Sequence, residues 1–215
     1  TGDIVAMSAL DWKKYDVQGL SIVGLLSRKE PTWVLVSDDK PEYLEKGALV
    51  LCDHELLQRQ MKRMRPDLQL ERMEETVKRL KAEADVAELD EEEIWPWIED
   101  QRLQGNLDGF IVPRAVHAGH RMKGRRHTLG LQRDRTENNR ERFIPPPLYG
   151  FTLLVSRKGF PKDNVRNMLD PSAELAYRLE ASLMESIDPK LRPIIGAYVE
   201  QRKISTLLKL SLIHI

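Results

Sequence analysis

The chain has 215 residues, of which 41% are hydrophobic and 32% are charged, as in an ordinary folded globular protein. Lysine plus arginine equals aspartate plus glutamate at 34 each, so no net charge favours nucleic acid or an acidic membrane as a partner. The single cysteine, Cys52, excludes an internal disulfide, and no apolar run approaches the roughly 20 residues that span a bilayer. We therefore expect a cytoplasmic monomer without nucleic-acid or membrane partners.

Strands dominate the beginning of the chain, and helices follow them. Short apolar runs predict strands at residues 3–8, 19–26, 33–37 and 47–52. Helical spacing of apolar residues then predicts helices at 55–65, which ends before Pro66, and at 71–84.

The second half of the chain mixes apolar strands with two charged stretches. Residues 85–106 are acidic and are predicted to form an insertion on the surface, whereas the basic stretch 121–142 is predicted to be a solvated loop. Strands are expected at 107–113 and 151–156. Pro171 begins a predicted amphipathic helix whose apolar stripe consists of Leu175, Leu179, Leu183 and Ile187. Strands that alternate with helices predict an α/β fold with mixed, largely parallel sheets.

Three local motifs suggest reactive or metal-binding chemistry. Cys52 and His54 could form an activated thiolate, although neighbours at a strand end rarely face each other productively. The helix that starts at His54 lacks the second histidine of the zinc-protease motif, because Gln58 stands there. His117, His120 and His127 have no cysteine or carboxylate in the same stretch, so solvent-facing histidines are expected rather than a metal site.

The order of several segments is more specific than any single motif. Gly2-Asp-Ile-Val-Ala-Met-Ser-Ala-Leu-Asp11 resembles Ala-Asp-Ile-Ala-Val-His-Ser-Met-Lys-Asp, and Arg65-Pro-Asp-Leu68 resembles Arg-Arg-Pro-Asp-Leu. Later, Leu107-Asp-Gly-Phe-Ile-Val112 is similar to Tyr-Asp-Ala-Ile-Ile-Leu, and Pro193-Ile-Ile-Gly-Ala-Tyr-Val-Glu200 to Val-Pro-Ile-Gly-Ser-Tyr-Ala-Glu. In this order, over nearly the whole chain to Lys209, the segments resemble the porphobilinogen deaminases, also called hydroxymethylbilane synthases.

The resemblance implies bilobal, periplasmic-binding-protein-like domains and the start of a small α+β third domain. Residues 1–27 and 145–160 would form an incomplete first domain. Residues 28–140 would form the second domain, with an insertion near 85–106, and the third would start at 161–209. The final hexapeptide, 210–215, resembles a translated library-adapter sequence, so we expect it to lie outside the fold and the natural protein to extend beyond both ends.

The deaminases join four porphobilinogen units on a dipyrromethane cofactor, which a thioether tethers to one cysteine. The resemblance places Asp11 at the catalytic aspartate, and Ser8 and Arg79 at substrate-binding positions. The cofactor cysteine falls at Leu191, which cannot form a thioether, so no dipyrromethane is expected in this chain. Arginines that would bind pyrrole carboxylates are replaced by Leu56, Leu57 and Glu74.

These replacements predict a tetrapyrrole-biosynthesis relative whose transferase activity is lost. Two alternatives remain, an active divergent hydroxymethylbilane synthase and a non-catalytic ligand-binding or interaction module on the same scaffold. A pyrrole or tetrapyrrole is the expected ligand. Asp11 could equally be an aspartate that bonds nearby amides, and Ser8 and Arg79 ordinary turn and surface residues.

Overall fold

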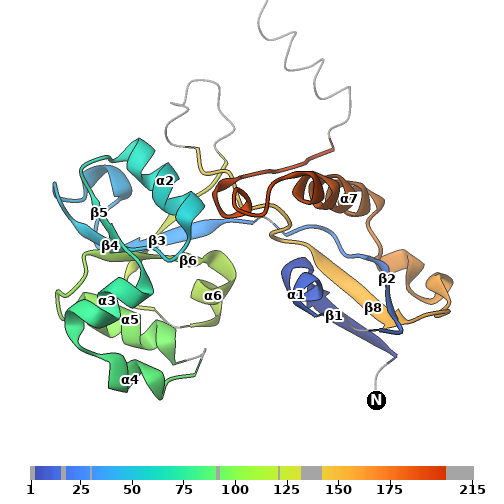
Figure 1. Cartoon of the computed structure of the whole chain (residues 1–215), viewed down its shortest axis with the longest axis horizontal. Helices are drawn as coiled ribbons and strands as arrows, with labels where there is room; N and C mark the ends of the chain where they lie inside the picture. Colours follow the sequence, from blue (N-terminus) through green and yellow to red (C-terminus); the bar gives the residue numbers. More distant parts are fainter. Residues whose placement is uncertain are drawn as a thin grey trace, which may run out of the picture. The chain divides into compact units, whose positions relative to one another are not determined.

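The chain forms two α/β units in the computed structural model, which describes residues 3–15, 18–29, 31–90, 93–120, 122–131 and 142–201 (Figure 1). Unit 1 comprises the described residues within 1–30, 146–192 and 197–201, and unit 2 those within 31–145 and 193–196. The predicted second domain, 28–140, corresponds closely to unit 2. The expected adapter-like hexapeptide, 210–215, lies outside the described residues. No helix in the described part of the chain is long and apolar enough to cross a bilayer.

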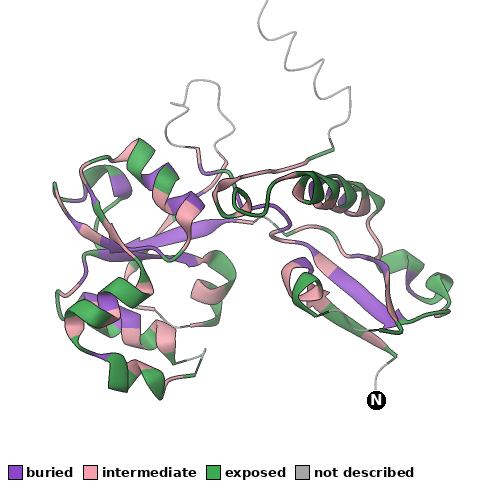
Figure 2. Cartoon of the chain, viewed as in Figure 1, coloured by how far each residue is buried: buried purple, intermediate pink, exposed green. Residues whose placement is uncertain are grey.

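Unit 1 contains a three-stranded sheet in the order β1 (Ile4–Ser8), β8 (Thr152–Arg157), β2 (Leu20–Leu25). Both pairings are antiparallel, so the expectation of largely parallel sheets is wrong for this unit. The central strand β8 is largely buried (Figure 2). One face packs against α1 (Ala9–Lys14) and α7 (Pro171–Ser186), and the other against the 3-10 helix η3 (Lys162–Met168).

Helix α7 presents a different face to the sheet than the sequence pattern predicts. Leu175, Leu179 and Leu183, the predicted core stripe, are 48%, 50% and 40% exposed. The buried face instead carries Ala173, Ala176 and Glu180. Small residues allow the helix to approach the sheet closely, and a buried ion pair accounts for the glutamate. Residues 161–192 therefore belong to unit 1, and the expected separate third domain is wrong for them.

Glu180 is the centre of a buried polar cluster in unit 1. Its carboxylate is fully buried and accepts hydrogen bonds from Arg28 at 2.7 and 3.2 Å. Backbone N–H groups of Leu148 and Val199 also donate to it, at 2.7 and 2.9 Å. The Arg28 guanidinium donates to the Tyr149 carbonyl and lies 4.0 Å from the centre of the Phe151 ring. Three chain segments are thus bonded to helix α7 through a single carboxylate.

Unit 2 contains a five-stranded sheet in which four strands share one direction. The strand order is β5 (Gln69–Glu71), β4 (Leu49–Leu51), β6 (Gly109–Pro113), β3 (Trp33–Ser37), β7 (Arg125–Leu129). Strand β4 is parallel to β5 and β6, and β3 is antiparallel to β6 and β7. Strands β4 to β7 therefore end at one edge of the sheet, and β3 begins there.

Helices cover both faces of this sheet. Helix α2 (Glu55–Met64) lies on one side, and α3 (Met73–Leu80), α5 (Ile94–Leu103) and α6 (Arg114–Gly119) lie on the other (Figure 1). A short 3-10 helix, η1 (Pro41–Tyr43), follows β3, and another, η4 (Arg192–Ile194), follows α7. The predicted helix 71–84 is divided into α3 and α4 (Glu83–Ala87), because Lys81 adopts a left-handed conformation with φ of 55°.

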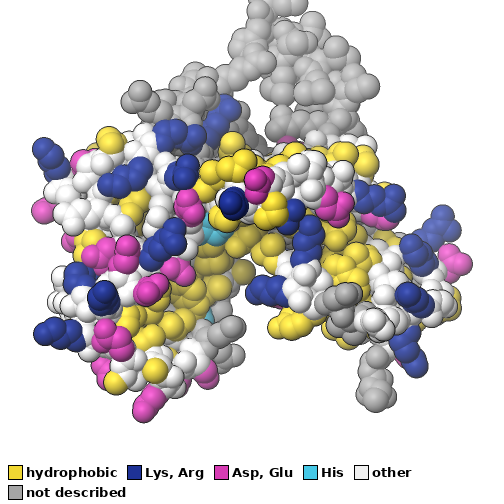
Figure 3. Space-filling model, viewed as in Figure 1, with side chains coloured by type: hydrophobic (Ala, Val, Ile, Leu, Met, Phe, Trp, Pro, Cys, Tyr) yellow, Lys and Arg dark blue, Asp and Glu magenta, His cyan; other side chains and the backbone are white. Residues whose placement is uncertain are grey.

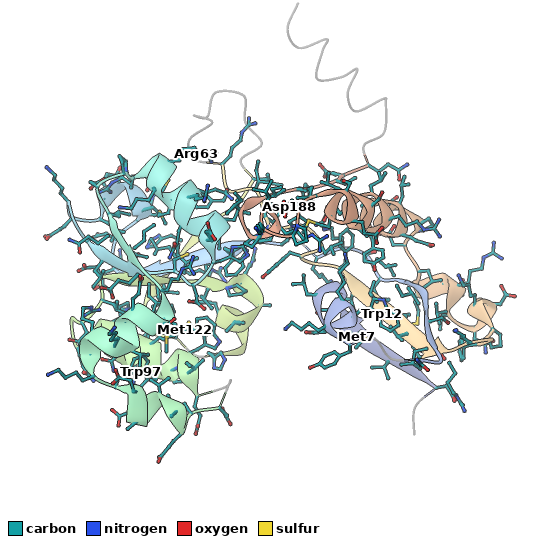
Figure 4. All side chains as sticks on the ribbon, in the orientation of Figure 1. Met7, Trp12, Arg63, Trp97, Met122 and Asp188 are labelled. Atoms are coloured by element: carbon teal, nitrogen blue, oxygen red, sulfur yellow. The ribbon has the colours of Figure 1, made fainter. Side chains whose placement is uncertain are left out.

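The two charged stretches of unit 2 contribute a partly buried helix and a strand to its fold, although the sequence predicts a surface insertion and a loop. The predicted insertion 85–106 contains α5, whose Ile98, Glu99 and Arg102 are buried. Glu99 accepts hydrogen bonds from Arg102 and from the backbone of Gly124, both at 2.9 Å. The predicted loop 121–142 contains strand β7, which begins just after this contact. Trp97 and Met122 pack on the same side of the sheet and help to join the two stretches (Figure 4).

Candidate functional site

The strand order of unit 2 creates a topological switch point between β4 and β6. From β4 the chain passes outward to β5, and it then returns to the other side of β4 to form β6. The helices that follow β4 and β6 consequently leave toward opposite faces of the sheet. In open α/β sheets, ligands bind outside the carboxyl ends of the strands at such a point. The candidate site is therefore where β4 and β6 end.

Four residues and one helix terminus define this switch-point site: Trp33, Asp53, His54, Arg114 and the first turn of α2. Trp33 opens β3 opposite Pro113, the last residue of β6. Arg114 follows directly, and its backbone N–H donates to the Thr32 carbonyl at 3.0 Å. This bond fixes the start of α6 against the start of β3.

His54 precedes α2 and packs against an aromatic wall. Its ring meets Trp33 edge-on, with 5.6 Å between ring centroids. Burial lowers the pKa of His54, and the nearby Asp53 and Glu55 only partly oppose this shift. The imidazole is therefore neutral at pH 7, where it can both donate and accept a hydrogen bond.

The two acidic residues beside the site are already engaged. Asp53 accepts a hydrogen bond from the Met73 backbone N–H at 3.1 Å, which caps α3. Glu55 pairs with Arg59 at 3.0 Å and with Arg72 at 3.7 Å. Arg114, by contrast, is exposed and forms no ion pair with another described residue. The α2 amides receive no side-chain cap from His54. The site thus has a surplus of positive charge and donors.

Cys52 lies beneath the site as a structural thiol. It is 1% exposed, and its Sγ donates to the His54 carbonyl at 3.6 Å. Burial raises its pKa from 9.0 to about 12. The side chain of Gln58 also donates to the Cys52 carbonyl at 2.7 Å. The Cys52–His54 pair suggested by the sequence therefore does not form an activated nucleophile.

We predict that iodoacetamide at pH 8 alkylates native Cys52 at least about a thousand times more slowly than the unfolded chain. Because the folded pKa is the higher one, the thiol stabilises the fold below pH 9 and loses this contribution as pH rises toward about 12. Unfolding free energy should consequently fall by up to about 1.4 kcal/mol per pH unit in that window from this group. Intact-mass kinetics check the first expectation, and equal alkylation rates in buffer and in urea would contradict it.

Ser8 and Asp11 lie together in unit 1, but as a helix cap. Ser8 Oγ accepts a hydrogen bond from the Asp11 backbone N–H at 3.0 Å, and it donates to Asp11 Oδ2 at 2.6 Å. The Asp11 side chain is 48% exposed and lies 3.8 Å from Lys14. In this arrangement the Asp11 carboxylate bonds the Ser8 hydroxyl at the start of α1, and the catalytic and binding roles of the two residues stay predictions. Met7, at the family's histidine position, and Trp12 pack against the unit 1 core (Figure 4).

Of the remaining predicted binding positions, Arg79 and Leu191 lie outside the switch-point site, whereas Leu56 and Leu57 belong to the first turn of α2 but have buried side chains. Arg79 pairs with Glu71 at 3.0 Å and donates to the Asn106 carbonyl at 3.1 Å. Leu56 and Leu57, which were expected to replace carboxylate-binding arginines, are 6% and 0% exposed and belong to the core. Leu191 is 48% exposed in the turn after α7.

The described histidines do not gather with other potential metal ligands. No three His, Cys, Asp or Glu side chains within the described ranges are placed to hold a metal ion. His117 was expected to face solvent, but both of its ring nitrogens are buried, without a hydrogen-bond partner among the described residues. Burial, reinforced by Arg126, lowers the pKa of His117 and keeps it neutral.

Sequence reasoning found the Cys52–His54 segment but missed Arg114 and Trp33. Both stand at strand ends, which the apolar runs located within a few residues. The sequence pattern does not give the strand order, which brings the start of β3 and the end of β6 to the same edge of the sheet.

No protein-family model matches the chain, and a search of curated proteins finds no match. Among solved structures, YhfZ from Shigella flexneri is similar at 15% identity, over 91% of this chain and 76% of that one, with a TM-score of 0.31. The VFT2 domain of Bordetella pertussis BvgS is 11% identical over 85% of this chain and 65% of that one, with a TM-score of 0.28. A ligand-binding component of an ABC-type import system from Staphylococcus aureus, solved with zinc bound, is 11% identical over 93% and 68%, with a TM-score of 0.32. At these values the similarities carry no argument about function.

Proposed function

We propose that this chain is a non-catalytic binding module that holds a small carboxylate at the switch-point site of unit 2. The observation that carries the proposal is the placement of Arg114 and the uncapped first turn of α2 at the ends of adjacent parallel strands. Helix N-terminal amides and an arginine bind carboxylates through complementary charge and hydrogen bonds. The neutral His54 and the Trp33 ring offer a polar contact and an apolar wall for the rest of the ligand.

The resemblance to the porphobilinogen deaminases suggests the class of ligand. Pyrroles that carry acetate and propionate groups combine a flat apolar ring with carboxylates, which suits the aromatic wall and the cationic donors. A bilobal, periplasmic-binding-protein-like scaffold is part of the same proposal. Cytoplasmic location and a monomeric state stay predictions.

Binding without turnover is favoured over an active transferase, because neither of the two candidate positions supplies a nucleophile that could attach the cofactor. Leu191 has no nucleophilic atom, and the Cys52 thiol is buried with a pKa of about 12. Incubation with porphobilinogen should leave the denatured mass of the protein unchanged. A mass increase of two pyrrole units would instead support an active, divergent hydroxymethylbilane synthase.

The test is calorimetric titration with porphobilinogen and with succinate. Arg114→Gln should weaken binding at least about tenfold, since a hydrogen bond to a charged group contributes about 1.5–3 kcal/mol. Arg125→Gln is the matched control, because Arg125 is also exposed but begins β7 at the opposite edge of the sheet. It should change affinity by less than about twofold.

Three outcomes separate the parts of this proposal. Equal losses from the two arginine variants, or no binding of either probe, would contradict the proposed site. If succinate binds and porphobilinogen does not, the proposed carboxylate site stands and the proposed pyrrole ligand is contradicted.

A further inference from the structure

A hollow in unit 2 lies between the segment that leads into α5 and helix α6, away from the switch-point site. Its volume is about 920 Å³. The lining residues that matter for the argument are Asp90, Glu93, Ile94, Trp95, Val116 and Gly119. All of them come from two short segments of unit 2, residues 89–96 and 116–120.

The floor of the hollow is apolar. Ile94, Trp95 and Val116 pack against the unit 2 core with part of their surface, and each remains partly exposed. They therefore form a supported apolar wall that can receive a further side chain. An aromatic residue in such a position also attracts cations over its ring face.

Two carboxylates, Asp90 and Glu93, lie among the described residues that line the hollow, within an acidic stretch of the sequence. Residues 83–100 include nine aspartates and glutamates and no lysine or arginine. On the rim, the Glu93 backbone donates to Asp90 Oδ1 at 2.9 Å and the Asp90 backbone to Glu93 Oε2 at 3.2 Å. These reciprocal bonds hold both carboxylates in place. No lysine or arginine is among the described residues that line the hollow. Hydrophobic and acidic side chains lie side by side over α4 and α5 (Figure 3).

We propose that this hollow docks a short basic peptide segment of a partner protein. One large apolar side chain of the segment occupies the floor formed by Ile94, Trp95 and Val116. Its lysines or arginines face Asp90 and Glu93, and the acidic stretch steers the approach. Charge complementarity selects this partner, because an uncharged apolar molecule would gain nothing from the Asp90 and Glu93 carboxylates on the rim. The proposal does not depend on a carboxylate at the switch-point site.

Gly119 provides a variant that fills the hollow without straining the fold. A Cβ built on Gly119 meets no atom within 4 Å, and the backbone does not require glycine there. Gly119→Phe should therefore occupy the hollow, whereas Gly119→Ala should leave it open. Thermal unfolding should confirm that both variants remain folded.

The experiment measures fluorescence anisotropy of a labelled Lys-Leu-Lys-Phe-Lys-Leu-Lys peptide added to the full chain. Gly119→Phe should weaken binding at least about tenfold, and Gly119→Ala less than about twofold. The same peptide with glutamate in place of lysine should not bind. Failure of the basic peptide to bind, or equal affinity for the two glycine variants, would overturn the proposal.

Two double variants compare the carboxylates that line the hollow with carboxylates that lie outside its lining. Asp90→Asn with Glu93→Gln should weaken peptide binding about tenfold. Glu83→Gln with Asp85→Asn removes the same charge from α4, outside the lining, and should weaken it less than about threefold. Equal losses from the two pairs would show a diffuse electrostatic attraction and would also overturn the proposal.

Discussion

Replacement of Glu180 with alanine is expected to destabilise unit 1 by about 3–5 kcal/mol, because removing one partner of a buried ion pair leaves the other charge uncompensated. Arg28 would keep its contact to Tyr149 but lose its carboxylate. The N–H groups of Leu148 and Val199 would also lose their acceptor. Each buried, unsatisfied donor adds to the cost.

Urea denaturation followed by circular dichroism measures this effect. Glu174→Ala is the matched control, since Glu174 lies on the same helix and pairs with Arg178 at the surface. The control should change the unfolding free energy by less than about 1 kcal/mol. If the two variants lost similar stability, the buried cluster would not have the role assigned to it.

Leu57→Arg is expected to prevent stable folding of unit 2, at a cost above about 4 kcal/mol. This change introduces an arginine that the deaminase resemblance expects. Leu57 is 0% exposed on the inner face of α2, where a guanidinium would be buried without a partner. The third replaced arginine position, Glu74, is exposed at the start of α3. Glu74→Arg should therefore cost only about 1 kcal/mol, from an unfavourable charge at a helix N-terminus.

Far-ultraviolet circular dichroism and the yield of folded protein measure the two substitutions side by side. A folded Leu57→Arg variant as stable as Glu74→Arg would show that position 57 tolerates the family arginine. It would also restore position 57 as a candidate ligand contact.

Much of the fold could be predicted because apolar runs mark buried strands. The run at 33–37 coincides with β3, and helix 55–65 differs from α2 by a single residue. Strand β7 was missed because most of its side chains are polar and exposed. The sequence predicts a surface position for residues 85–106, because the acidic residues around α5 obscure the buried Ile98 and Arg102.

Other errors came from interactions between distant parts of the chain. The leucine stripe of α7 has the spacing of a core face, yet the adjoining face with Ala173, Ala176 and Glu180 is buried, and Glu180 pairs there with Arg28. Arg65 similarly carries part of the deaminase resemblance, but its guanidinium bonds the carbonyls of Pro41 and Leu44 at 2.7 and 2.9 Å. Hydrogen bonding to Arg65 lowers the pKa of Asp67 to about 2. The motif therefore has a structural explanation.

The candidate site was only partly predictable for a similar reason. Cys52 and His54 stood out as reactive residue types, whereas Arg114 follows a strand without any distinctive motif. Its importance depends on β6 lying beside β4, and the sequence does not specify that pairing.

The central claim is that a small carboxylate binds at the carboxyl ends of β4 and β6. Amide chemical-shift mapping during titration with succinate tests it most directly. The account predicts the largest shifts at residues 53–57 and 113–116, with little change at the Arg125 end of β7. Largest shifts at the amino ends of these strands, or in unit 1, would contradict it.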